Sequence, residues 1–133
     1  MATLSLEQSL ELSELCKTMI SFNPGISGVA IINKNGRILT TKFRNDSIIK
    51  NLSPQEIEML CMQRVLQTSM NKELNEKLGT LRFTISYRCH LLELIIPFNN
   101  GIVLITLDHG LEIQNTINQI EELIKEFELQ TIR

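Results

Sequence analysis

The stretch GVAIINKNG, residues 28–36, decides the fold, because a run of apolar residues leads directly into a tight-turn sequence. A second strand-like run follows at residues 37–43. Asparagine and glycine both tolerate the positive φ angles that two-residue hairpin turns require. We therefore predict a β-hairpin with its turn at Asn35-Gly36.

One helix is predicted on each side of this hairpin. The first begins at the capping residue Ser5, and Pro24 ends it because proline cannot continue the helical hydrogen-bond ladder. After a polar loop at residues 44–52, the second begins at Ser53, which precedes a proline and a capping glutamate. We expect this helix to run to about Lys77, shortly before a glycine that can stop it.

Three further strands and a third long helix complete the chain. Residues 80–87 alternate between apolar and polar side chains, as in a strand with one wet side. Residues 91–96 and 102–107 are almost unbroken apolar runs, joined by a second Asn-Gly turn. Residues 113–127 repeat isoleucine or phenylalanine at helical spacing, which indicates an amphipathic helix. The predicted element order is α-β-β-α-β-β-β-α.

The composition of the strands predicts their order in the sheet. The first, fourth and fifth are apolar on both faces and belong in the middle, whereas the second and third alternate with polar residues, as edge strands do. Hairpins place the first strand beside the second, the third beside the fourth, and the fourth beside the fifth. The order that satisfies these conditions is 2-1-5-4-3, in an α/β fold with helices on both faces of the sheet.

Length, charge and cysteine pattern exclude several classes of protein. A chain of 133 residues predicts one domain over residues 1–133. The net charge of −2 argues against a nucleic-acid binder, which has a basic face. No apolar run has the roughly 20 residues of a membrane span, and residues 1–15 lack the basic start of a signal peptide. Cys16, Cys61 and Cys89 form no paired pattern and lie in apolar runs, so we expect buried reduced thiols in a cytoplasmic protein.

The second helix carries apolar residues around most of its circumference. They are Ile57, Met59, Leu60, Cys61, Met62, Val65 and Leu66. A helix that is apolar all round is buried on more than one side, and a sheet can cover only one of them. Either a second copy of the chain covers the other side, or the loop at residues 44–52 folds over it.

Taken together, these features resemble the roadblock/dynein light chain family. Residues 28–36 are similar to the first hairpin of that family, in which Gly-Val and two apolar residues precede an Asp or Asn and, three positions later, a glycine. The long second helix, the three-strand meander and the final amphipathic helix match in order and length, so the resemblance covers roughly residues 8–127. Residues 15–42 also resemble short archaeal roadblock-like proteins without an assigned function.

The resemblance implies a profilin-like sandwich, with the second helix on one face of the sheet and the first and third helices on the other. It also implies dimers in which the second helix and the edge strand at residues 80–87 of each copy meet. We assign the dimer interface to Met59, Met62, Leu66, Met70, Arg82, Thr84 and Ser86. Arg82 and Arg88 either contact the partner or protect the strand edge from unwanted pairing.

Family members act as regulators, scaffolds or motor-complex subunits, often for small Ras-like GTPases. The resemblance therefore implies a non-enzymatic homodimeric module that binds a small GTPase or another protein. The long loop at residues 44–52 and the Met-rich second helix depart from the family, so the identity of the partner is not carried over. The alternative function is a small-molecule sensor of PAS-like architecture, which needs a pocket between sheet and helix.

No group of residues in the sequence has the spacing of a catalytic, metal or cofactor site. His90 and His109 lack ligand-spaced partners, and the neighbours Cys89 and His90 would point to opposite faces of a strand. We therefore predict no enzyme activity, no bound metal and no cofactor. The basic residues near the first hairpin form either a solvated rim or a surface for an acidic partner; they are Lys34, Arg37, Lys42, Arg44 and Lys50.

Overall fold

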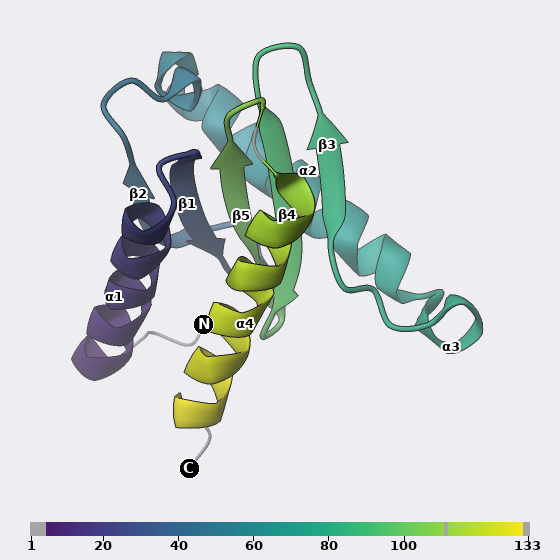
Figure 1. Cartoon of the computed structure of the whole chain (residues 1–133). Helices are drawn as coiled ribbons and strands as arrows, with labels where there is room; N and C mark the ends of the chain where they lie inside the picture. The colour runs from purple at the N-terminus through teal and green to yellow at the C-terminus, as the bar shows by residue number, and fades with distance from the viewer. Residues whose placement is uncertain (1–4, 111, 132–133) are drawn as a thin grey trace.

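A five-stranded antiparallel sheet with helices on both faces forms the centre of the computed structural model, which describes residues 5–110 and 112–131 (Figure 1). The strands are β1 (Ile26–Ile32), β2 (Ile38–Phe43), β3 (Thr84–Tyr87), β4 (Leu92–Phe98) and β5 (Gly101–Leu107). The helices are α1 (Leu6–Phe22), α2 (Pro54–Lys72), the short α3 (Asn75–Leu78) and α4 (Ile113–Thr131), and a 3-10 helix, η1 (Ile48–Asn51), precedes α2. Residues 1–4, 111 and 132–133 of the expected domain lie outside the described residues.

The strand order is β2-β1-β5-β4-β3, which confirms the order predicted from strand composition. The middle strands β1 and β5 are buried along their whole length, and β4 is buried except at Pro97. The edge strands β2 and β3 are instead half-buried or exposed. Strands that are apolar on both faces lie in the middle because both of their faces are covered by helices.

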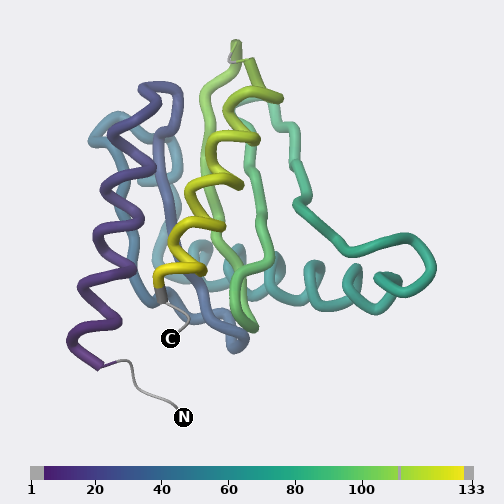
Figure 2. Tube along the Cα trace, turned by 60° about the horizontal axis from the view of Figure 1, so that its bottom comes forward, coloured from purple at the N-terminus to yellow at the C-terminus, as the bar shows by residue number. Residues whose placement is uncertain are grey.

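The sheet separates two hydrophobic cores. Figures 1 and 2 show α1 and α4 on one face and α2 on the other. The larger core packs residues such as Met19 of α1 and Ile120 of α4 against β1, β4 and β5. The smaller core packs Cys61 and Val65 of α2 against Ala30, Ile32, Ile95, Ile102 and Leu104. The helices therefore lie on the faces that the roadblock resemblance implies.

The first hairpin forms as predicted, but its turn differs from the expected two-residue type. Only Gly36, and not Asn35, has a positive φ, and the Gly36 N–H donates to the Asn33 carbonyl oxygen at 2.9 Å, so the turn spans four residues from Asn33. The Asn33 side chain accepts hydrogen bonds from the backbone N–H groups of Asn35, at 2.9 Å, and Arg37, at 3.1 Å. Gly36 has a φ of +79°, a conformation that costs a glycine little. A Cβ added at this position would also lie 3.2 Å from Met62 of α2, so the turn needs glycine for both reasons.

The second helix is shorter than predicted. Its capping box at Ser53 and Glu56 is present, but α2 ends at Lys72 rather than near Lys77, and a separate turn of helix, α3, follows before Gly79. Figure 1 shows this end of α2 projecting past the sheet. Most helical stability in proteins comes from packing, so a helix that has left the sheet loses the contacts that would continue it.

The strand predicted at residues 80–87 is also shorter, because β3 begins only at Thr84. The register that pairs Thr84 with Ile95 would place Arg82 opposite Pro97. Proline has no N–H group to donate, so it cannot make the next pair of ladder hydrogen bonds. The other predicted boundaries differ from the observed ones by a few residues. Among the described residues, no helix is both long and apolar enough to cross a membrane.

Candidate interaction surface

Four of the predicted interface residues form one exposed row along α2. Met59, Met62, Leu66 and Met70 are 56, 45, 54 and 64% exposed. Their spacing of three or four residues places them on one face of the helix, and Cys61 and Val65 are buried between this helix and the sheet. We call these four residues the α2 row.

The loop at residues 44–52 does not cover the α2 row within the described part of the chain. Its 3-10 helix η1 buries Ile49 and lies near the beginning of α2, where Ile48, Ile49 and Leu52 line a cavity together with Met59 and Leu60. The row itself stays exposed along about three turns of helix. An uncovered row of this kind exceeds the scattered apolar residues that a monomer ordinarily exposes.

Thr84 and Ser86 of β3 lie beside the end of this row. Both are half-buried, and they line a hollow of about 470 Å³ together with Met70 and Asn71 of α2. The structure thus brings together helix and strand residues that are far apart in the sequence. Figure 1 shows β3 at the outer edge of the sheet.

Among the described residues, the outer edge of β3 has no neighbouring strand, so its backbone groups are free to pair. The Arg88 N–H donates to the Leu91 carbonyl oxygen at 2.9 Å, and the register of β3 with β4 has no irregularity. Because N–H groups alternate in direction along an antiparallel strand, those of Thr84 and Ser86 also point towards β4. The N–H groups of Ile85 and Tyr87 therefore point away from the sheet, where another strand can pair with them.

Arg82, in contrast, is separated from the α2 row. Its guanidinium forms an ion pair with Glu121 of α4, on the opposite face of the sheet, with an Nη2 to Oε1 distance of 2.6 Å. The hydrogen bond to Glu121 is the main reason why the pKa of Arg82 is raised above its usual value. Arg82 is thus engaged within the chain and does not lie with the other predicted interface residues.

A buried charge network under α2 was not predicted from the sequence. Glu93 of β4 is 2% exposed, and its carboxylate accepts hydrogen bonds from Arg64 of α2 at 2.7 and 3.1 Å and from Arg88 at 3.1 Å. Arg64 is itself buried and donates a further bond to Gln67. One signal was present: Glu93 is a carboxylate inside a strand that was predicted to be buried on both faces, and such a group requires a partner.

This network ties α2 to the hairpin between β3 and β4. Arg64 approaches from the helix and Arg88 from the end of β3, and the two guanidinium groups share one carboxylate. The bidentate contact of Arg64 fixes the rotation of α2 on the sheet. The angle between the α2 row and the free edge of β3 is therefore set partly by a buried ion pair.

A second cavity lies at the other end of α2. It has a volume of about 660 Å³ and lies between η1, the first turns of α2 and the β3–β4 turn. Leu52, Leu60 and Leu91 give it an apolar lining, and Glu93, Cys89 and His90 are its polar boundary. Cys89 and His90 are exposed and occupy the turn itself rather than a strand.

Arg44 differs from the other basic residues near the first hairpin. Its guanidinium donates to Asp108 at 2.9 Å, to Asp46 at 3.2 Å and to the Pro24 carbonyl oxygen. The hydrogen bond with Asp108 is the largest cause of its raised pKa. Arg44 therefore joins the turn after α1 to the end of β5, so it is not part of a purely solvated rim.

The cysteines correct one prediction. Cys16 and Cys61 are buried as expected, but Cys89 is exposed, because it lies in a turn and not in an apolar strand. Burial raises the pKa of the Cys16 thiol to about 11 and also raises that of Cys61. Within residues 5–110 and 112–131, no three or more His, Cys, Asp or Glu side chains form a group that could hold a metal ion.

We expect one thiol of the native protein to react rapidly with Ellman's reagent at pH 8. Only Cys89 is accessible, and raised pKa values keep the two buried thiols in their unreactive protonated form. The absorbance released before and after unfolding in urea measures the fast and total thiols. Cys89→Ser should remove the fast phase, and a fast phase that survives this substitution would contradict the assignment.

Structural comparison identifies the fold. The chain is similar to a roadblock/LC7 domain from Streptomyces avermitilis, with a TM-score of 0.69 and 9% identity over 91% of this chain and 98% of that one. It is also similar to the gliding protein MglB from Thermus thermophilus, with a TM-score of 0.70 and 9% identity over 98% and 96% of the two chains. For MglB from Myxococcus xanthus the TM-score is 0.72, with 9% identity over 99% and 98%.

The chain has the roadblock fold, as its sequence predicts. The solved structures that share this fold also include MglC from Myxococcus xanthus and an MglB with a tetrameric arrangement, at TM-scores of 0.60 and 0.64. No family model and no curated protein matches the sequence itself. At 9–10% identity, the likeness to these structures concerns the fold alone.

Proposed function

We propose that the chain acts as a single roadblock-like domain that forms homodimers and binds other proteins, with no enzymatic activity of its own. The observation that supports this proposal is the exposed α2 row beside the free edge of β3. A twofold axis near β3 would place the same surface of each copy against the other, as closed dimers require.

Dimer formation would stabilise both the α2 row and the free edge of β3. The α2 row exposes four large apolar side chains, and burying each of them stabilises a complex by about 1 kcal/mol or more. The free edge of β3 supplies backbone N–H and C=O groups that a second β3 can bond. In the proposed dimer, an antiparallel β3–β3 pair would extend the sheet, and the two α2 rows would meet beside it.

Ile85→Pro is expected to weaken the dimer while the monomer still folds. The N–H of Ile85 points to the free edge, so its loss removes a bond between copies but none to β4. Thr84→Pro is the matched control, because it removes an N–H that points to β4. Light scattering across a range of protein concentrations measures the dimer, and thermal unfolding measures the fold.

The two variants should separate cleanly. Ile85→Pro should shift the protein towards monomer with a small change in melting temperature, and Thr84→Pro should lower the melting temperature. A wild-type protein that is monomeric at tens of micromolar would contradict the dimer. A dimer that survives Ile85→Pro would place the interface away from β3.

The partner that we propose is a small Ras-like GTPase or another protein, acting in the cytoplasm. The roadblock resemblance supports the GTPase as partner. The three free cysteines, two buried and one exposed, favour a reducing compartment. The test is binding to small GTPases from the same genome, each loaded with GDP or with a non-hydrolysable GTP analogue. Equal and negligible binding to every GTPase in both nucleotide states would exclude this class of partner.

A small-molecule sensor is the second candidate function, and one observation favours it. The cavity of about 660 Å³ between η1, α2 and the β3–β4 turn lies in the size range of ligand pockets. Native mass spectrometry of protein purified without detergent tests this function. A stoichiometric ligand lost on Leu60→Trp, which would fill the cavity, supports the sensor, and a spectrum of the bare chain counts against it.

A further inference from the structure

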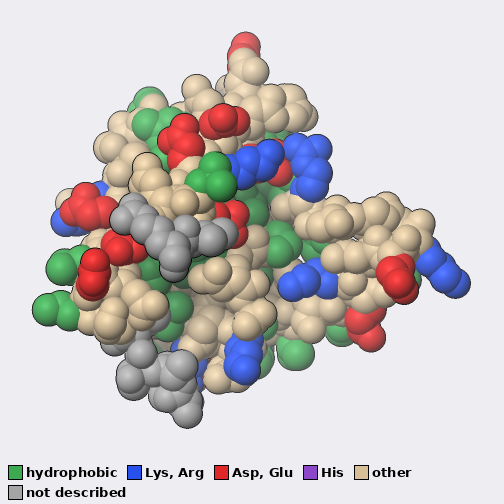
Figure 3. Space-filling view, turned by 90° about the horizontal axis from the view of Figure 1, so that it is seen from below, with side chains coloured by type: hydrophobic (Ala, Val, Ile, Leu, Met, Phe, Trp, Pro, Cys, Tyr) green, Lys and Arg blue, Asp and Glu red, His purple; other side chains and the backbone are tan. Residues whose placement is uncertain are grey.

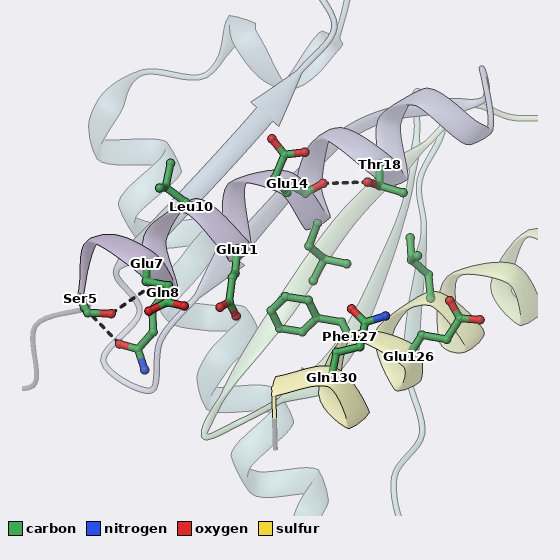
Figure 4. A pocket seen from close by; sticks show the side chains of 12 residues that line it. Ser5, Glu7, Gln8, Leu10, Glu11, Glu14, Thr18, Glu126, Phe127 and Gln130 are labelled. Carbon is green, nitrogen blue, oxygen red and sulfur yellow. Dashed lines mark hydrogen bonds between the residues drawn. The ribbon is translucent and has the colours of Figure 1, made fainter. Parts of the chain in front are cut away.

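A groove lies between α1 and α4, on the face of the sheet opposite the α2 row. Its volume is about 960 Å³, and its lining extends along α1 from Ser5 to Thr18 (Figure 4). A helix rises 1.5 Å per residue, so the groove is roughly 20 Å long. That length matches three to four turns of a second helix.

The floor of this groove is apolar. Leu15 contributes from α1, and Leu123 and Phe127 contribute from α4. Figure 4 shows Phe127 pointing into the space between the two helices. Leu10 is 59% exposed and lies at the solvent-facing edge of the groove, where its side chain is free to contact another molecule.

The rim of the groove is acidic. Glu7, Glu11 and Glu14 line it on α1 and Glu126 lines it on α4, and no arginine or lysine is among the lining residues. Within the described parts of the chain, only Glu14 of these four has an ion pair, at 3.6 Å from Lys17. The other three carboxylates are therefore not neutralised by a side chain of the described residues.

The acidic character extends over both helices. Together α1 and α4 carry seven glutamates and two lysines, a net charge of −5, whereas the whole chain has a net charge of −2. The rest of the chain is thus net positive. Figure 3 shows carboxylates and apolar side chains close together at the end where α1 begins.

We propose that this groove binds a basic amphipathic helix of a partner protein. The apolar stripe of such a helix would cover the floor, and its lysines and arginines would meet the carboxylates of the rim. A helix fits better than a strand, because α1 and α4 satisfy their own backbone hydrogen bonds and offer no free strand edge. Anionic membranes and nucleic acids carry the same sign of charge as the rim and are repelled.

This proposal is independent of the dimer. The groove and the α2 row lie on opposite faces of the sheet, so a dimer formed through α2 and β3 leaves both grooves accessible. A dimer with one groove on each copy would bind two basic helices at once. That arrangement is a bivalent scaffold.

The test uses a labelled synthetic helix of about 14 residues, with leucines at positions i, i+3, i+4 and i+7 and lysines elsewhere. Fluorescence anisotropy with the full chain measures its affinity, and a matched peptide with glutamates in place of the lysines controls for apolar contact. We expect the basic peptide to bind, with an affinity that falls as salt is raised, and the acidic peptide not to bind.

Two triple variants locate the binding. Glu7→Gln/Glu11→Gln/Glu126→Gln should weaken the basic peptide about tenfold, since three exposed charge contacts are lost. The control Glu58→Gln/Glu73→Gln/Glu76→Gln changes the net charge by the same amount, but its sites lie on α2, its C-cap and α3. It should weaken peptide binding less than twofold. Leu10→Gln should also weaken binding, because it removes apolar surface at the edge of the groove without disturbing a buried residue.

Three results would overturn the proposal. Equal effects of the two triple variants would mean that overall charge, and not the groove, attracts the peptide. Equal binding of the acidic peptide would mean non-specific apolar contact. Binding of the full chain to phosphatidylserine vesicles in preference to the basic peptide would assign this surface to a membrane. Light scattering of the same variants measures the dimer separately. A failure of peptide binding therefore does not contradict the proposed dimer interface at the α2 row.

Discussion

Glu93→Leu is expected to lower the free energy of unfolding by roughly 3–5 kcal/mol, because it leaves the Arg64 guanidinium buried without a counter-charge. Arg64 is held by two bonds to this carboxylate, and its remaining partner within the described residues is the amide of Gln67. Arg88 also loses its contact but can turn towards water, since its side chain is 62% exposed.

Urea unfolding at one fixed protein concentration measures this effect. The double variant Arg64→Met/Glu93→Leu should recover most of the lost stability, because it removes both buried charges and fills the space with apolar atoms. Glu121→Gln is the matched control: it breaks an ion pair with an exposed arginine, so the urea midpoint should change little.

The outcome separates two roles of the network. A double variant that is stable but no longer forms dimers would show that the ion pair positions α2 for assembly. A single variant with nearly wild-type stability would mean that Arg64 reaches solvent easily, which contradicts the buried network.

Leu66→Asp is expected to convert the dimer into a monomer. Leu66 lies in the middle of the α2 row and is 54% exposed in the single chain. Residues near the centre of an interface contribute most of its binding energy, and an unpaired carboxylate buried there is unfavourable. We expect the free energy of dimerisation to become less favourable by about 2 kcal/mol or more, which raises the dissociation constant roughly 30-fold.

Leu129→Asp is the control for this substitution. Leu129 is 75% exposed on α4, on the other face of the sheet, so the same chemical change there should leave the dimer intact. Sedimentation velocity at several concentrations distinguishes the two variants. If Leu66→Asp and Leu129→Asp sediment identically as dimers, the α2 row is not the interface.

The strand order and the two hairpins with Asn-Gly turns were predictable because they depend on local chemistry. Asn35-Gly36 indicates a turn because glycine adopts a positive φ easily, and the apolar runs at β1, β4 and β5 indicate strands covered on both faces. Hairpin connections then leave one arrangement of five strands. An apolar side of α2 that the sheet does not cover was also predictable, because a helix with apolar residues on most sides cannot bury all of them against one sheet.

The predictions that failed depend on neighbours distant in the sequence. The end of α2 at Lys72 depends on where the sheet stops beneath it, and the late start of β3 depends on Pro97 of another strand. Arg82 was expected to share a strand face with Thr84 and Ser86, but β3 begins after it and Glu121 holds its side chain on the other face of the sheet; the dimer interface itself stays a prediction. The pattern of neighbouring residues along the sequence carries no information about these long-range contacts.

For this protein, the sequence by itself determined the order of the strands, the positions of the turns and the presence of a helix with more apolar surface than the sheet can cover. Only the tertiary structure decided which side of that helix stays exposed, that Arg64 and Glu93 meet beneath it, and that acidic residues of the first and last helices form one groove. The physical reason is the range of the interactions. Turn preferences and strand burial act over a few residues, whereas ion pairs and shared surfaces exist only after distant elements have packed together.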